Sequence, residues 1–178
     1  KFGAKTVLAI DSSGPAIEIA RENARLNGVE NSVTCDEADA QTVLTSFARG
    51  QQPFRPDMIL LDPPSFVPSK KHLPGALRNY VKLNASALSA LSKGGLLATS
   101  TCSHHVGREE FITMLRFAAS KAQKSVRLLA LRGQAAENAR EVERHLQAAE
   151  DETDAGLLRA VDFYRARARI AMTDVPID

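Results

Sequence analysis

The chain has 178 residues, of which 44% are hydrophobic and 25% charged, a composition typical of a globular domain and not of a disordered chain. Lys and Arg number 23 against 21 Asp and Glu, so any nucleic-acid-binding surface would have to be local. Two cysteines exclude a disulfide scaffold and a multi-cysteine zinc site. No apolar run approaches the roughly 20 residues of a membrane span, and no signal peptide is visible, so we expect a cytoplasmic protein without membrane contact.

Short apolar segments alternate with amphipathic segments along the first three-quarters of the chain. The apolar segments predict buried strands at 5–10, 32–35, 57–61, 95–101 and 125–131. The intervening patterns predict helices that begin near 12–15 and end at 27–28, that cover 41–48, and that include 77–91 and 111–118. This order predicts an α/β protein with a mainly parallel sheet covered by helices on both faces.

The pattern changes after Gly133. The charged segment 137–154 carries one narrow apolar stripe typical of a helix, and the alternation of Arg and Ala within 163–172 favours a half-exposed edge strand. We therefore divide the chain into a main domain at 1–136 and a divergent C-terminal segment at 137–178. Because the chain does not begin with Met, we also expect it to be a piece of a longer protein.

Polar or reactive residues follow four of the predicted strands. In an open α/β sheet, ligands bind beyond the carboxyl ends of the strands. Asp11 stands at the first such position, where a carboxylate can accept hydrogen bonds from ribose hydroxyls or can simply cap the next helix. Asp39 follows the second strand, where its carboxylate could accept a hydrogen bond from an adenine amino group or could cap the start of the next helix.

The segment Asp62–Phe66 follows the third strand. Two consecutive prolines stiffen the turn, so the Asp62 carboxylate is held in place and Phe66 lies where it could pack on a flat substrate. A rigid turn alone would explain the prolines, but packing explains an Asp at a strand end poorly, which favours a functional site. A basic cluster follows this turn and could bind phosphates or be a solvated loop; it comprises Lys70, Lys71, His72, Arg78 and Lys82.

Cys102 follows the fourth strand, with His104, His105 and Arg108 close by in sequence. These neighbours would favour the reactive thiolate, whereas Cys35 lies inside a predicted strand and is interpreted as a core residue. A hydrolase with a Cys–His catalytic dyad is an alternative interpretation, although no sequence feature indicates an oxyanion hole. A metal site lacks further ligands at recognisable spacing, so we predict no metal.

Several of these segments resemble motifs of a known enzyme family. Asp11 with RENARLNG at 21–28 looks like the second motif of class I S-adenosylmethionine-dependent methyltransferases, and the segment Asp62–Phe66 looks like their fourth. The strings DPPSFVPSKK at 62–71 and GGLLATSTCSHHVGREEF at 94–111 together resemble the RlmI-type family of 23S ribosomal RNA cytosine-5 methyltransferases. The resemblance extends from Lys1 to about Ala135.

The resemblance implies a Rossmann-like fold, S-adenosylmethionine as cofactor and ribosomal RNA as substrate. Cys102 would be the nucleophile that adds to C6 of cytosine, and Asp62 would hold the base and take part in proton transfers. The base that removes the C5 proton is left open between water, Asp62 and His104. The implied cofactor-binding residues are Asp11, Ser12, Asp39, Ala40 and Asp62, and the implied RNA-binding residues are Pro63, Pro64, Phe66, Lys70 and Lys71.

The family's Gly-rich first motif, with its strand, would lie upstream of Lys1, as would an RNA-binding PUA domain. Two other functions stay open. One is an amino-directed RNA methyltransferase that uses Asp62 and Phe66 and leaves Cys102 structural. The other is a non-catalytic RNA-binding remnant. Ribosomal RNA is the predicted partner, and a homodimer is one option for the assembly.

Overall fold

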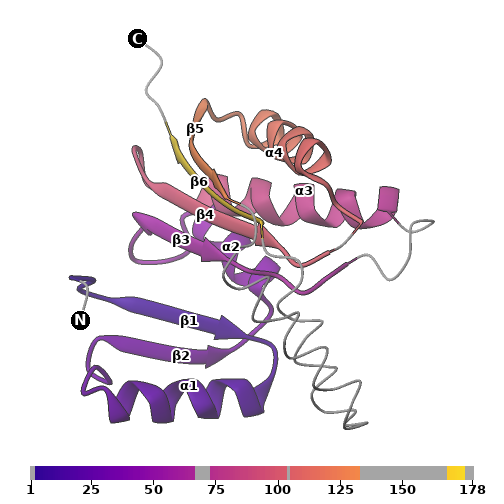
Figure 1. The fold of residues 1–178 in the computed structure, drawn as a ribbon. Coiled ribbons are helices and arrows are strands. Elements are labelled where there is room, and N and C mark those ends of the chain that lie inside the picture. The colour runs from indigo at the N-terminus through magenta and orange to yellow at the C-terminus, as the bar shows by residue number, and fades with distance from the viewer. Residues whose placement is uncertain (1–2, 67–72, 104, 133–167, 175–178) are drawn as a thin grey trace, which may run out of the picture. The chain divides into compact units, whose positions relative to one another are not determined.

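The computed structural model describes residues 3–66, 73–103, 105–132 and 168–174, and the chain forms two compact units, Lys1–Ser46 and Phe47–Asp178 (Figure 1). The predicted helix at 137–154, the predicted boundary at 136, Lys70, Lys71, His72 and His104 all lie outside the described residues.

The first unit contains a pair of parallel strands and a helix that packs on them. Strand β1 (Val7–Asp11) pairs with β2 (Val33–Glu37), with Asp11 opposite Glu37 at the carboxyl ends. Helix α1 (Gly14–Leu26) connects the two strands and buries Ile17 and Ala24. Helix α2 (Ala40–Ala48) follows β2. The strand–helix–strand order predicted from the sequence is confirmed here.

The ends of α1 follow from local sequence signals. The Ser13 hydroxyl accepts a hydrogen bond from the Ala16 amide at 3.4 Å, which caps the first turn, and a proline follows within that turn. After the helix, Gly28 has a φ of +62°, a left-handed conformation that glycine adopts without steric cost. Both signals lie where the sequence placed them, at 12–15 and 27–28.

The second unit contains a four-stranded sheet in the order β3-β4-β6-β5. Strand β3 (Met58–Leu61) runs parallel to β4 (Leu96–Thr101), with Leu61 opposite Thr99. Helix α3 (Leu73–Ala90) joins these two strands, and α4 (Arg108–Ala122) leads from β4 to β5 (Val126–Arg132). Figure 1 shows α3 and α4 together on one face of this sheet.

Strand β6 (Ala168–Asp174) corrects the prediction for the C-terminal segment. The Arg and Ala alternation predicted an edge strand, but β6 lies between β4 and β5 and runs antiparallel to both. The alternation could not reveal this, because a strand's neighbours are chosen by pairing with distant segments and not by its own period. The part of the predicted strand at 163–167 lies outside the described residues.

The core of the second unit is built by α3, α4 and β4. Its largest fully buried side chains include Tyr80, Leu91, Leu97, Phe111 and Met114. No helix within the described residues is long and apolar enough to cross a membrane. In the same part of the chain, no group of three or more His, Cys, Asp or Glu side chains could hold a metal ion.

Candidate functional site

Asp11 and Ser12 lie at the carboxyl end of β1, both exposed. The Asp11 carboxylate accepts a hydrogen bond from the Ser13 amide at 2.8 Å, so it helps to shape the turn into α1. The Asp11 backbone carbonyl also accepts a bond from the Ala38 amide at 2.9 Å, which ties this turn to the segment after β2. The cap of α1 is therefore Ser13 and not Asp11, whose exposed side chain shapes the turn before the helix.

Asp39 and Ala40 lie at the start of α2. The Asp39 carboxylate accepts bonds from the Thr42 amide at 2.7 Å and from the Thr42 hydroxyl at 2.6 Å, which is helix capping. Asp39 is nevertheless exposed. Because β1 and β2 are parallel neighbours, Asp11 and Asp39 follow adjacent carboxyl ends of one strand pair. The structure brings these two predicted cofactor-binding residues to the same edge of the first unit.

Asp62 lies directly after β3 and is exposed. The Ser100 hydroxyl, on the neighbouring strand β4, donates a hydrogen bond to Asp62 Oδ1. Ser100 itself is buried. A buried donor on a central strand thus orients the carboxylate of an exposed residue. Ser100 was not predicted as a site residue, because a serine within an apolar strand gives no functional signal.

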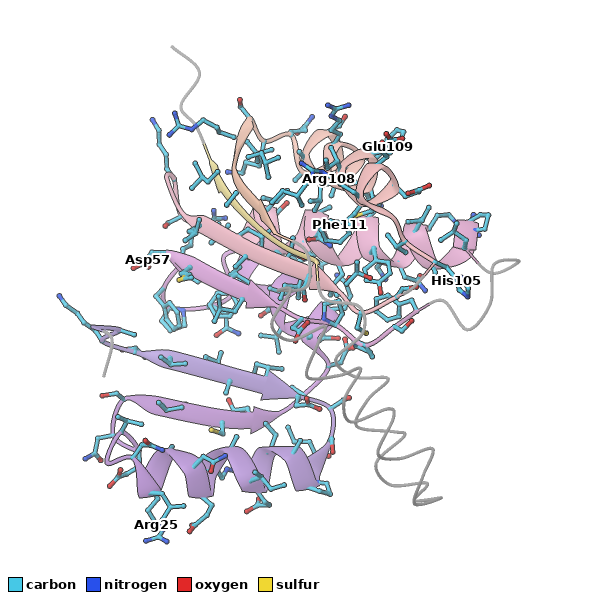
Figure 2. The ribbon with its side chains drawn as sticks, in the orientation of Figure 1. Arg25, Asp57, His105, Arg108, Glu109 and Phe111 are labelled. Atoms are coloured by element: carbon cyan, nitrogen blue, oxygen red, sulfur yellow. The ribbon has the colours of Figure 1, made fainter. Side chains whose placement is uncertain are left out.

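Cys102 follows β4 and is half-buried, in contrast to Cys35, which is 5% exposed inside β2. The Cys102 Sγ contacts the Pro63 carbonyl oxygen at 3.9 Å, so the thiol lies against the turn that holds Asp62. His105 follows in the same loop. Figure 2 shows Asp57 at the start of β3 and His105 at the opposite end of the sheet, where β3 and β4 end. The structure thus brings the predicted thiol and carboxylate segments together.

Tyr80, on α3, joins these segments and was missed by the sequence analysis. It is 0% exposed, and its hydroxyl donates to the Pro64 carbonyl at 3.3 Å and accepts from the Thr101 hydroxyl at 3.0 Å. Burial raises the pKa of Tyr80 above the usual 10.0, and the nearby charges of Asp62 and Cys102 act in the same direction. A tyrosine on the apolar face of a helix is normally a core residue. Only the need of its buried hydroxyl for a hydrogen-bond partner could have indicated that Tyr80 contacts polar groups.

The remaining predicted substrate residues surround the same turn. Pro63 is buried, Pro64 is exposed and Phe66 is half-buried. The Phe66 ring meets the Tyr80 ring edge to face, with centroids 4.8 Å apart and planes at 63°. Lys70 and Lys71 lie outside the described residues. This edge therefore offers a thiol that can add to an electron-poor ring, a carboxylate that can accept hydrogen bonds, and an aromatic ring that can pack on a base.

Comparison with known proteins identifies relatives of the sequence. The chain is 37% identical over 139 residues to the ribosomal RNA large subunit methyltransferase I of Aeromonas hydrophila, covering 78% of this chain and 34% of that protein. It is 35% identical over 135 residues to the protein of that name from Erwinia tasmaniensis, with 75% and 34% covered. The chain thus spans about a third of the length of these relatives. No protein-family profile matches it.

Solved structures share the fold. NSun6 from Pyrococcus horikoshii, crystallised with SFG, superposes with a TM-score of 0.64 at 17% identity, covering 97% of this chain and 42% of that one. A methyltransferase homologue from the same organism gives a TM-score of 0.61 at 18% identity, covering 96% and 53%. The chain therefore has the Rossmann-like α/β fold of these solved structures and is similar in sequence to the large-subunit ribosomal RNA methyltransferases I over 75–78% of its length.

Proposed function

We propose that the protein transfers a methyl group from S-adenosylmethionine to C5 of a cytosine in ribosomal RNA, with Cys102 as the nucleophile and Asp62 as the residue that holds the base. The names of the sequence relatives support ribosomal RNA as the substrate, and the fold supports methyl transfer. A ribosomal RNA substrate also agrees with the expected cytoplasmic location.

The position of Cys102 is the observation that favours C5 as the methylated atom. The Cys102 Sγ lies 3.9 Å from the Pro63 carbonyl, at the edge where β3 and β4 end, and the thiol is half-buried instead of enclosed. A cysteine with a purely structural role would more often be enclosed, as Cys35 is at 5% exposure. A reactive thiol next to a base-binding carboxylate is what carbon-directed methylation of a pyrimidine requires.

The reaction assigns one role to each side chain. The Cys102 thiolate forms an S–C6 bond, and the electron pair of the C5–C6 double bond moves onto C5, which becomes nucleophilic. The Asp62 carboxylate accepts a hydrogen bond from the amino edge of the cytosine and keeps the ring in place. After C5 has gained the methyl group, a base takes the C5 proton, the electron pair of that C–H bond restores the double bond, and the thiolate leaves. Water, Asp62 and His104 are the candidates for this base. Cys102 thus returns to its starting state.

The first unit supplies residues that fit the cofactor. The exposed carboxylates of Asp11 and Asp39 follow adjacent parallel strands, and carboxylates at such positions accept hydrogen bonds from ribose hydroxyls and amino groups. We assign Asp11 and Ser12 to the ribose and Asp39 and Ala40 to the adenine. When bound, S-adenosylmethionine supplies an electrophilic methyl group.

The substrate side of the proposal rests on the turn after β3. Phe66 would pack on the target base, Pro63 and Pro64 would keep the turn rigid, and Lys70 and Lys71 would bind phosphates of the RNA. A base inside a paired stem cannot reach the thiol, so the target cytosine would have to be unpaired or flipped out.

The test uses two cysteine variants of the intact protein with ribosomal RNA as substrate. Cys102→Ala should abolish methyl transfer, whereas Cys35→Ala, with a buried thiol in β2, should keep it. An RNA carrying fluorine in place of hydrogen at C5 of cytosine should trap a covalent adduct, because the last step needs a proton at C5. This adduct should form with the wild type and be absent with Cys102→Ala.

An amino-directed methyltransferase is the second candidate, because Asp62 and the half-buried Phe66 could serve an exocyclic amino group without any thiol. Mass spectrometry of the digested RNA separates the two. A methyl group on an exocyclic nitrogen, together with full activity of Cys102→Ala, would overturn the proposal in favour of this candidate. RNA binding without any methyl transfer by the intact protein would overturn both.

A further inference from the structure

The hydroxyl of Tyr80 uses every hydrogen bond that a phenol can make. It donates to the Pro64 carbonyl at 3.3 Å and accepts from the Thr101 hydroxyl at 3.0 Å and from the Phe66 amide at 3.5 Å. A phenol has one donor and two acceptor positions, so no position is left over. All three partners belong to the two segments that hold Asp62 and Cys102.

The turn after β3 depends on an outside partner of this kind. Pro63 and Pro64 have no backbone N–H, so the turn has few ways to bond to itself. The Pro64 carbonyl and the Phe66 amide are only partly buried, and each finds its protein partner in the Tyr80 hydroxyl. Tyr80 supplies both from α3, and its ring also packs edge-on against Phe66 at 4.8 Å.

The segment after β4 is tied to the same hydroxyl. The Thr101 hydroxyl donates to Tyr80 and accepts a bond from the Ser103 amide at 3.2 Å, so it shapes the turn in which Cys102 lies. Thr101 is 2% exposed and Ser103 is 5% exposed, which shields both bonds from water. Tyr80 therefore bonds to the residue before Cys102 and to the residue after Pro63.

We propose that Tyr80 is a positioning residue that fixes the Cys102 thiol relative to the turn holding Asp62. The catalytic consequence rests on the function proposed above, whereas the effect on the thiol does not. A phenol is protonated at neutral pH, and burial raises the pKa of Tyr80 further above 10.0, so its hydroxyl can donate to Pro64. A tyrosine that served only the core would act through its ring, and loss of the hydroxyl would leave the site unchanged.

The test replaces Tyr80 by Phe in the intact protein, which keeps the ring and removes the hydroxyl. With ribosomal RNA as substrate, we expect kcat to fall by about 10- to 100-fold, the scale of a small misplacement of reacting groups, while KM stays within about twofold. We also expect the rate of Cys102 alkylation by iodoacetamide, measured at one fixed pH, to rise. The reason is that a thiol no longer held against the Pro63 carbonyl is more accessible to the reagent.

Matched threonine variants keep the proposal testable if Tyr80→Phe does not fold. Thr101→Val should raise the rate of Cys102 alkylation in the same way, and Thr101→Ser, which keeps the hydroxyl, should react at the wild-type rate. Thr113→Val makes the same chemical change at an exposed position on α4 and should have no effect.

Two results would overturn the proposal: an unchanged rate of Cys102 alkylation in folded Tyr80→Phe, or equal alkylation rates in Thr101→Val and Thr101→Ser. If the wild-type protein methylates no RNA, the proposed function fails, and the alkylation measurement still decides whether Tyr80 positions the thiol.

Discussion

Two threonines on the same face of β4 should respond in opposite ways to the same substitution. Thr99 is 1% exposed, and its hydroxyl has no hydrogen-bond partner among the residues that the structure describes. Thr101, two positions further along, is 2% exposed and makes two hydrogen bonds through its hydroxyl. Replacing each by Val keeps the shape and the β-branch but exchanges the hydroxyl for a methyl group.

The expected free energies follow from these bonds. Burying a hydroxyl without a partner costs about 1–3 kcal/mol, so Thr99→Val should raise the free energy of unfolding by about 1 kcal/mol. Thr101→Val loses two bonds worth about 1 kcal/mol each and leaves the buried Ser103 amide unpaired, so it should lower the free energy of unfolding by about 2–3 kcal/mol. The two variants should therefore differ by roughly 3–4 kcal/mol.

Urea unfolding of both variants, with Thr113→Val as an exposed control, measures this difference. The slope of the free energy against urea should stay constant, and the midpoint should rise for Thr99→Val and fall for Thr101→Val. The control should stay within about 0.5 kcal/mol of the wild type. If Thr99→Val lowers the free energy of unfolding as much as Thr101→Val does, the assignment of an unpartnered hydroxyl at Thr99 is wrong.

Three further perturbations test other parts of the chain. Ser100→Ala removes the hydroxyl that donates to the Asp62 carboxylate. Because a hydrogen bond to a charged group is worth about 1.5–3 kcal/mol, methyl transfer to RNA should slow by roughly 10- to 100-fold. Unchanged kinetics would show that Ser100 does not contribute to the site. Since the pKa of Tyr80 is raised in the folded state, the free energy of unfolding should decline as pH rises above 10.0, the ordinary pKa of tyrosine. Tyr80→Phe has no phenol to titrate, so its free energy of unfolding should decline less than that of the wild type over the same pH range. Ser13→Ala removes the cap of α1 and should lower the free energy of unfolding by about 1 kcal/mol in urea titrations, whereas Ser12→Ala, at the exposed neighbouring position, should not.

The order of strands and helices was readable from the sequence because each element carries its own local pattern. The apolar run at 95–101 became β4 at Leu96–Thr101, and the helix expected at 41–48 became α2 at Ala40–Ala48. The segments that became β3 and β4 are largely apolar, so the polar and reactive residues that directly follow them stand out. For this reason the segments around Asp62 and Cys102 could be singled out before their positions in space were known.

The partners of those residues were decided by the tertiary structure. Ser100 donates to Asp62 across 38 positions of sequence, and Tyr80 reaches Thr101 across 21. In the sequence, a serine within a strand and a tyrosine on the apolar face of a helix occupy the same positions as ordinary core residues, so the pattern of apolar residues does not mark them as functional. The place of β6 between β4 and β5 was equally hidden, since its alternating residues indicated only a strand. Local periodicity reports how a segment is buried, whereas hydrogen-bond partners and strand neighbours depend on which distant segments meet when the chain folds.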